Sequence, residues 1–284
     1  LRNADTAMYR AKSDGRNRIS LYCADMNEQS QLQLSFESRL RNALINNEFY
    51  LEYQPKIDVE SHTVVGVEAL IRWQDREDGV VQPDRFIGLA EEIGLISDIG
   101  YWVLKKAVLQ ALRWQTDGIT LVVSVNVSIK QFANQNLPAQ ISHLLVLTGL
   151  DPKLLDIEVT ESHVMDNFAQ MNLDIAAIRA LGVSVSMDDF GTGYSSLSML
   201  TKMPLDYLKI DRSFMEGVPG KKENEVLISI IILMANNLGL KVIAEGVESV
   251  EQLVFLSHLG CQQIQGFYFS KPIAAHLIVA YVEQ

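Results

Sequence analysis

Short apolar segments alternate with longer amphipathic segments along most of the chain, and this alternation restricts the fold more than any other feature. From Phe49 onward, β-branched runs of about five to eight residues are separated by helical patterns of about ten to twenty. The expected strands are Tyr50–Gln54, Val64–Leu70, Leu121–Val127, Leu154–Thr160, Val183–Asp188, Tyr207–Ile210, Lys241–Ala244 and Gln263–Phe269. Such alternation implies parallel pairing, and eight strands suggest an α/β fold closed into a (β/α)8 TIM-like barrel. An open doubly wound sheet is the alternative, but no GxGxxG motif follows the first strand to support it.

The segments between the strands have the periodicity of helices, and several end at glycine, as helix C-termini prefer. A long helix is expected over Asn27–Asn47, before the first strand. The other expected helices are Asp84–Ile93, Ile99–Gln115, Leu137–Thr148, Met171–Leu181, Glu225–Leu238 and Val250–Leu259.

Most of the expected strands carry, at or near their C-terminal ends, a residue that can bind a metal or a phosphate. In a parallel barrel these ends share one face, so residues far apart in the sequence should converge there. The oxygen donors are Glu68, Asn126, Glu158, Asp188, Asp189, Glu245 and Gln265, and Lys209 is the one cation among them. One such residue alone is more often a solvated strand end. A full set at successive strands is hard to explain that way, because clustered carboxylates are costly without a compensating cation.

The composition argues against nucleic acid as a partner and limits the kind of metal site. The 284 residues carry 35 acidic and 24 basic side chains, a net charge of −11, which argues against binding DNA or RNA. The two cysteines match no zinc spacing and indicate reduced thiols in a cytosolic protein, and the five histidines show no metal-site pattern. A metal would therefore be held mainly by oxygen, which favours Mg²⁺ or Mn²⁺.

Asp188 and Asp189 are adjacent carboxylates that close an apolar run and precede a Gly-Thr-Gly turn. Neighbouring carboxylates repel each other unless a cation lies beside them. The alternative is that one aspartate caps the next helix and the other is solvated. The partners at the other strand ends favour a metal site over a cap.

Seven ordered motifs resemble the signature set of the EAL domain, a family that hydrolyses the bacterial second messenger cyclic di-GMP to linear 5′-pGpG. The resemblance runs from about Phe36 to Gln284. The motifs are EALIRW at Glu68–Trp73, VNVS at Val125–Ser128, IEVTES at Ile157–Ser162, DDFGTGYSSL at Asp188–Leu197, LKIDRSF at Leu208–Phe214, AEGVES at Ala244–Ser249 and QGFYFSKP at Gln265–Pro272.

The resemblance implies a role for each matching residue and a barrel whose first strand runs antiparallel to the others. Two Mg²⁺ or Mn²⁺ ions would be held by Glu68, Asn126, Glu158, Asp188, Asp189 and Glu245. Lys209 would position or activate the attacking water, and Gln265 would hold a water at the metal or lie beside the nucleophile. Arg72 would pair with a substrate phosphate, Gln54 and Leu70 would contact the nucleotide, and Glu248 would anchor the loop after Asp189.

The N-terminal run ADTAMYRAKSDGRN resembles the last helix and strand of a GGDEF (diguanylate cyclase) domain. We therefore expect a GGDEF remnant and linker over residues 1–26 and an EAL barrel over residues 27–284. Because Leu1 is not a natural start, we expect GGDEF and sensory domains upstream in a longer parent protein. The expected location is cytoplasmic, and the parent protein could be anchored in a membrane through its N-terminal region.

Two other functions compete with a cyclic di-GMP phosphodiesterase. A catalytically silent cyclic di-GMP-binding receptor would gain nothing from so many carboxylates near an anionic ligand. An aldolase with Lys209 as a Schiff base would need a desolvated lysine and not one ringed by acids. The family also suggests a homodimer that acts through the Gly191–Leu200 loop, whose glycines permit movement.

Overall fold

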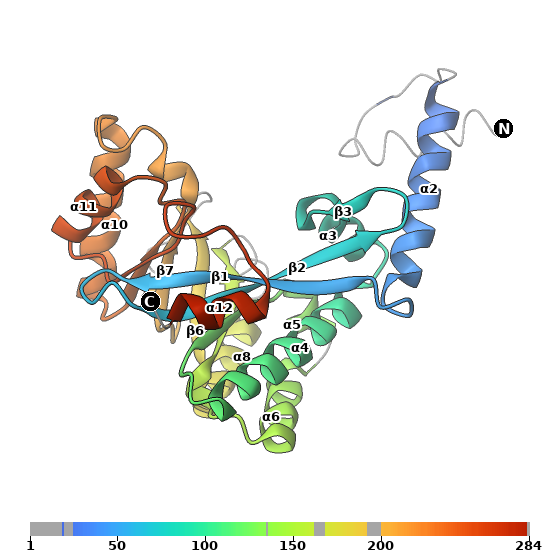
Figure 1. Cartoon of the computed structure of the whole chain (residues 1–284), viewed down its shortest axis with the longest axis horizontal. Coiled ribbons are helices and arrows are strands. Elements are labelled where there is room, and N and C mark those ends of the chain that lie inside the picture. Colours follow the sequence, from blue (N-terminus) through green and yellow to red (C-terminus); the bar gives the residue numbers. More distant parts are fainter. Residues whose placement is uncertain (1–18, 20–24, 135, 162–167, 192–199, 283–284) are drawn as a thin grey trace. The chain divides into compact units, whose positions relative to one another are not determined.

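The computed structural model describes residue 19 and residues 25–134, 136–161, 168–191 and 200–282 (Figure 1). The chain falls into two compact units. Unit 1 comprises Leu1–Tyr50 and Trp73–Leu95, and unit 2 comprises Leu51–Arg72 and Ile96–Gln284. The expected remnant at residues 1–26 lies almost entirely outside the described residues.

One sheet runs through the molecule in the order β1-β9-β8-β7-β6-β5-β4-β2-β3, and a further pairing of β1 with β2 closes eight of its strands into a barrel. Neighbours from β2 through β4 to β9 pair in parallel, whereas β1 is antiparallel to β9. The expected (β/α)8 barrel and its antiparallel first strand are thus confirmed. The strands are β1 (Phe49–Asp58), β2 (Val64–Asp75), β3 (Gly79–Val81), β4 (Val122–Asn126), β5 (Leu155–Thr160), β6 (Ser184–Phe190), β7 (Tyr207–Ile210), β8 (Lys241–Ala244) and β9 (Gln263–Ile264).

The helices of unit 2 pack against its parallel strands: α4 contacts β4, α8 contacts β6, and α10 contacts β7 and β8 (Figure 1). In a barrel strand, alternate residues face the interior and the helices. The helix-facing positions are apolar, as at Val123, Val125, Ile157 and Val159, all fully buried. The helices are α4 (Ile96–Thr116), α5 (Ile129–Asn134), α6 (Leu137–Thr148), α8 (Phe168–Ala180), α10 (Lys222–Asn237), α11 (Val250–His258) and α12 (Ala275–Val282), with 3-10 turns η1 (Pro152–Leu154) and η2 (Arg212–Met215).

Unit 1 is organised by aromatic side chains. It contains α2 (Asp25–Ala43), α3 (Pro83–Glu92) and the hairpin in which β3 pairs antiparallel with the end of β2. The rings of Phe36, Phe49 and Phe86 surround the fully buried Trp73 with centroid distances of 5.0, 6.1 and 5.9 Å. This cluster gives unit 1 a core of its own.

The element bounds differ from the expected ones where local packing decides them. β2 continues to Asp75 instead of ending at Leu70, so Arg72 lies within the strand. β9 ends at Ile264 instead of Phe269, and Gly266, just beyond it, packs so closely on the backbone of Val247 that a side chain would not fit there. Among the described residues, no helix is long and apolar enough to cross a membrane.

Candidate active site

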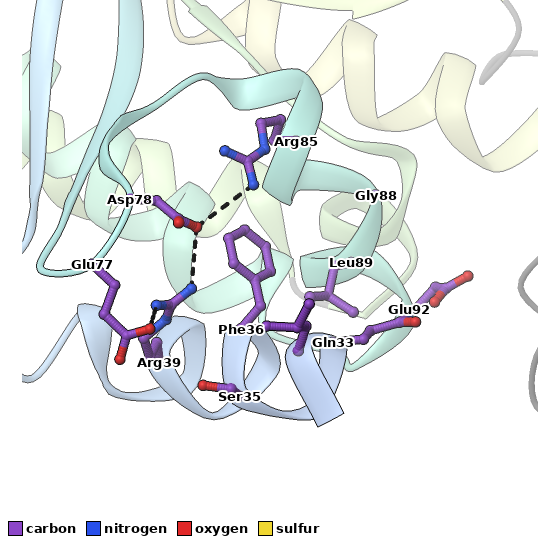
Figure 2. A pocket seen from close by; sticks show the side chains of 11 residues that line it. Gln33, Ser35, Phe36, Arg39, Glu77, Asp78, Arg85, Gly88, Leu89 and Glu92 are labelled. Carbon is purple, nitrogen blue, oxygen red and sulfur yellow. Dashed lines mark hydrogen bonds and ion pairs between the residues drawn. The ribbon is translucent and has the colours of Figure 1, made fainter. Parts of the chain in front are cut away.

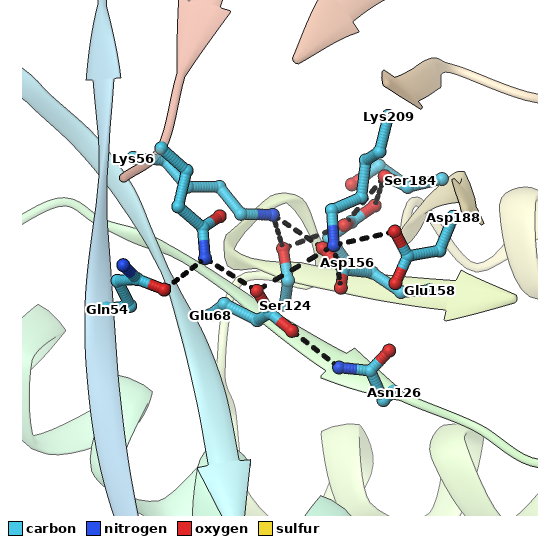
Figure 3. Close-up of polar contacts among 12 residues, drawn as sticks. Gln54, Lys56, Glu68, Ser124, Asn126, Asp156, Glu158, Ser184, Asp188 and Lys209 are labelled. Carbon is cyan, nitrogen blue, oxygen red and sulfur yellow. Dashed lines mark hydrogen bonds and ion pairs between the residues drawn. The ribbon is translucent and has the colours of Figure 1, made fainter. Parts of the chain in front are cut away.

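Four carboxylates from four strands or strand ends converge on the ammonium group of Lys209, which is completely buried in β7. Figure 3 labels three of them, Glu68, Glu158 and Asp188. Its Nζ lies 2.6 Å from Glu245 Oε1, 2.7 Å from Glu158 Oε2, 3.1 Å from Asp188 Oδ1 and 3.7 Å from Glu68 Oε2. Parallel pairing produces this arrangement, because it brings the ends of β5, β6, β7 and β8 to one face. The structure thus gathers five of the predicted site residues around one point.

Amide side chains extend the cluster through Glu68. Asn126 Nδ2 donates to Glu68 Oε1 at 2.6 Å, and Gln265 Nε2 donates to Glu68 Oε2 at 2.7 Å. Gln265 Nε2 also lies 2.9 Å from Gln54 Oε1, and Gln54 Nε2 donates to the Ser270 carbonyl. These contacts fix the orientation of the Glu68 carboxylate.

β6 contains a bulge at the Asp188–Asp189 pair. Met187 pairs with Leu208 and Phe190 pairs with Ile210, so β6 has one residue more than β7 over this interval. Asp189 absorbs the extra residue with φ 55°, a conformation that aspartate tolerates better than most side chains. Its amide donates to Asp188 Oδ1 at 2.9 Å. The expected pair of adjacent acids therefore comes with a backbone distortion that the sequence pattern did not predict.

Glu68, Leu70 and Arg72 share one face of β2, because they are spaced by two residues. Arg72 is buried, and its Nε donates to Glu52 Oε2 at 2.8 Å while Nη1 donates to the Ile71 carbonyl. A guanidinium that is held in this way keeps its other donors in a fixed fork, which suits a phosphate.

A second polar layer lies beneath the first and was missed by the sequence interpretation. Lys56 Nζ donates to Ser124 Oγ and to Glu158 Oε1, both at 2.6 Å. Ser124 Oγ donates to Asp156 Oδ2, and Ser186 Oγ lies 2.8 Å from both Asp156 oxygens. All are buried.

The two-residue spacing within each strand could have revealed this layer. Ser124, Asp156 and Ser186 each precede a site residue by two positions and share its face. In the antiparallel β1 the order is reversed, since Gln54 belongs to the upper layer and Lys56, two residues later, to the lower.

Burial and mutual repulsion perturb the site carboxylates. Burial raises the pKa of Glu68 and Asp188 despite Lys209, and it raises the pKa of Glu245 to about 8. Burial acts on Glu158 in the same direction, but the ammonium groups of Lys209 and Lys56 outweigh it and lower its pKa to about 2. Burial would lower the pKa of Lys209, yet the surrounding carboxylates hold it well above its usual range. The cluster therefore has more acid than its two lysines neutralise.

The same residues fit a divalent cation chemically. Within the described part of the chain, no three acidic, histidine or cysteine side chains are already arranged as metal ligands, because four carboxylates turn toward Lys209 instead. The available donors are nevertheless carboxylate and amide oxygens, the ligands that Mg²⁺ and Mn²⁺ prefer. The buried Gln265 Oε1 accepts no hydrogen bond from the described residues. Four carboxylates also share the one ammonium group of Lys209, so further positive charge would be stabilised there.

The loop that follows Asp189 is described only at its start. Residues 192–199 lie outside the described residues, so the predicted anchoring by Glu248, which is exposed, stays a prediction. At the start of the loop, Gly191 N donates to Glu161 Oε2 at 2.9 Å, and Glu161 is buried. Glu161 therefore holds the first residue of the loop.

Unit 1 contains a hollow of about 620 Å³, which is lined by none of the residues of the Lys209 cluster (Figure 2). It lies among α2, the β2–β3 turn and α3, where Arg39 and Arg85 each stand 5.6 Å from the ring centre of Phe36. Arg39 donates to Glu77 and Asp78, and Arg85 pairs with Asp78. These charges already neutralise one another, so the hollow is not the candidate site.

Comparison with known proteins gives consistent matches. The profile of the EAL domain matches residues 37–272. The chain is 41% identical over 96% of its length to the signaling protein YkoW of Bacillus subtilis. It is 40% identical over 99% of its length to the bifunctional diguanylate cyclase/cyclic di-GMP phosphodiesterase MucR of Pseudomonas aeruginosa, and 40% identical over 97% to the cyclic di-GMP phosphodiesterase PdeR of Escherichia coli. The chain spans 34%, 41% and 42% of the lengths of these three proteins.

Solved structures agree with these matches. The phosphodiesterase PaMucR in complex with c-di-GMP superposes with a TM-score of 0.82 at 39% identity, covering 87% of this chain and 99% of that one. The EAL enzyme Bd1971 with cAMP and cyclic di-GMP bound superposes with a TM-score of 0.84 at 31% identity, covering 97% of this chain and 73% of that one.

Proposed function

Because the chain belongs to the EAL domain family, we propose that it is a metal-dependent phosphodiesterase that hydrolyses cyclic di-GMP to linear 5′-pGpG. The observation that carries the proposal is the convergence of Glu68, Glu158, Asp188 and Glu245 on the buried ammonium of Lys209. No residue that the family motifs require is substituted. The relatives named as cyclic di-GMP phosphodiesterases support the substrate.

The metal ligands in this proposal are Glu68, Asn126, Glu158, Asp188, Asp189 and Glu245, for two Mg²⁺ or Mn²⁺ ions. Such ions supply Lewis acidity that makes hydroxide available near neutral pH and offsets charge on a phosphate. Excess carboxylate in the cluster supports this assignment, since a buried acid without a cation is costly.

The remaining residues have roles that follow from their contacts. Without metal, the surrounding carboxylates hold the pKa of Lys209 well above its usual range, and we assign its ammonium group the stabilisation of negative charge that develops on the phosphate. Gln265, held against Glu68, orients the attacking water. Arg72, braced by Glu52, binds a substrate phosphate, and Gln54 and Leu70 contact the nucleotide. In-line attack opposite the leaving 3′-oxygen then opens the ring and leaves the 5′-phosphate.

The test is chromatography of cyclic di-GMP incubated with the protein and Mg²⁺ or Mn²⁺. We expect linear pGpG with either metal and none in EDTA. Glu68→Ala should lose almost all turnover, because Glu68 joins Asn126 and Gln265 into one hydrogen-bonded unit. Its affinity for cyclic di-GMP should change less than its turnover. Binding of cyclic di-GMP by the wild type without product under both metals would refute hydrolysis and leave the receptor function.

We extend the proposal to a homodimer that tunes the loop after Asp189. An exposed apolar stripe on α10 supports it: Val226, Ile230 and Leu233 are 56%, 55% and 65% exposed and lie on one helical face. Ile230→Glu should yield a monomer in light scattering with weaker metal dependence of activity. A monomeric variant with unchanged activity and metal dependence would contradict the coupling.

Two further features belong to the proposal. The cytoplasm is the proposed location, where cyclic di-GMP and reduced thiols are expected. The upstream GGDEF domain stays a prediction from residues 1–26, in line with the bifunctional name of the MucR relative.

A further inference from the structure

Glu158 is held at both of its carboxylate oxygens by ammonium groups from opposite layers of the barrel (Figure 3). Lys209 binds Oε2 at 2.7 Å from the side of the other site carboxylates. Lys56 binds Oε1 at 2.6 Å from the layer below. Glu158 itself is 1% exposed, so water does not compete for either oxygen.

Lys56 is fixed in this position by its own partners. It is 3% exposed, and its ammonium group also donates to Ser124 Oγ at 2.6 Å. Ser124 in turn donates to Asp156, which contacts the Ser186 hydroxyl with both oxygens. The chain of contacts from Asp156 through Ser124 to Lys56 therefore restrains the ammonium group beside Glu158 Oε1.

The two lysines differ in how many site carboxylates they serve. Lys209 is shared among four carboxylates that face the centre of the site. Lys56 forms an ion pair with Glu158 alone among them, and it lies on the side away from that centre. Its direct contact with the site carboxylates is therefore confined to one oxygen of one residue.

We propose that Lys56 is a positioning residue that sets metal specificity by occupying Glu158 Oε1, so that Glu158 offers only Oε2 to a divalent cation. Ca²⁺ readily takes both oxygens of a carboxylate and accepts six to eight ligands, whereas Mg²⁺ demands a small octahedral shell. Restricting Glu158 to one oxygen thus disfavours Ca²⁺ relative to Mg²⁺. This inference rests on the divalent-cation site of the proposed function, and it adds a residue outside the family motifs quoted above.

The test is the ratio of metal affinities in Lys56→Met, measured by calorimetric titration of the full 284-residue chain with Mg²⁺ or Ca²⁺ alone and without nucleotide. Removing one positive charge changes the attraction for both divalent ions by a similar factor, so the ratio isolates the geometric effect. We expect Ca²⁺ to gain about tenfold on Mg²⁺ in the variant, because Glu158 is then able to offer both oxygens.

Two variants serve as controls. Lys105→Met removes an exposed positive charge on α4, away from the cluster, and should retain the wild-type ratio. Lys56→Met with Asp156→Asn removes one ammonium and one carboxylate together. This double variant keeps the buried charge balanced and carries the comparison if Lys56→Met alone does not fold.

An unchanged ratio in the Lys56 variants overturns the inference, as does an equal shift in Lys105→Met or a wild type that binds neither metal. The nucleotide assay distinguishes this failure from failure of the proposed function. Hydrolysis of cyclic di-GMP with an unchanged metal ratio refutes only the role of Lys56. A shifted ratio without hydrolysis refutes only the phosphodiesterase.

Discussion

Replacing Lys209 by Met should destabilise the metal-free protein, and the effect can be tested without any substrate. Methionine keeps an unbranched chain and removes the ammonium group. Glu158 retains Lys56, but Glu245, Asp188 and Glu68 lose the cation that lies 2.6, 3.1 and 3.7 Å from their oxygens. The variant therefore leaves buried carboxylates without compensation.

The cost follows from burial and protonation. Removing one partner of a buried ion pair costs about 3–5 kcal/mol. Lys209 is completely buried, but its neighbours are able to take up protons, as the pKa of about 8 for Glu245 already indicates. We therefore expect the lower end, about 3 kcal/mol at pH near 7.5. Acids with raised folded-state pKa values favour the folded state at low pH and lose that advantage as pH rises, so the deficit should shrink toward about pH 5.

Urea unfolding followed by tryptophan fluorescence, in EDTA, measures the difference. Lys105→Met is the matched control, since Lys105 is an exposed lysine on α4. Millimolar Mg²⁺ should stabilise Lys209→Met more than the wild type, because the metal and Lys209 compensate the same carboxylates. Equal stability of the variant and the wild type in EDTA near neutral pH would refute the reasoning.

Three further predictions concern the wild type and its core. In EDTA, the free energy of unfolding should fall as pH rises from 4.5 toward about 8, because over this range Glu245 ionises in the unfolded state but not in the folded state. Mg²⁺ should flatten this pH profile, and a flat profile in EDTA would contradict the prediction. Burial raises the pKa of the Cys261 thiol to about 12. In a Cys23→Ser variant, a thiol reagent at about pH 8 should therefore label the protein only when it unfolds, and rapid labelling of the native protein would disprove this prediction. Trp73→Ala should cost about 3–5 kcal/mol in urea unfolding because three aromatic rings surround the indole, and a loss below about 1 kcal/mol would be inconsistent with that packing.

The barrel and the upper layer of its site were predictable, because both follow from strand periodicity and from the motif residues. Parallel strands in register bring residues such as Asn126 and Glu158 side by side, and these two are direct partners in the β4–β5 ladder. Strand ends were less predictable. β9 ends at Ile264, and the chain beyond it packs Gly266 against the backbone of Val247, a contact between residues far apart in the sequence that no strand pattern reveals.

The lower layer escaped prediction for a physical reason. A buried lysine in a strand carries no signal of its own, since its meaning depends on which carboxylate faces it. Lys56 acquires a role only because the antiparallel β1 places it beside Ser124 and Glu158. The positive φ of Asp189 was not predictable from the sequence either, because a bulge depends on the register between two strands.

The bulge in β6 frees the Asp188–Asp189 pair from the alternation of a regular strand. Successive side chains of a regular strand point to opposite faces of the sheet, so one of two neighbouring acids would face away from the barrel interior. The extra residue in β6 and the φ of 55° at Asp189 interrupt this alternation, and Asp189 interacts electrostatically with Lys209 and Glu68. One strand can therefore direct two consecutive carboxylates toward the same site.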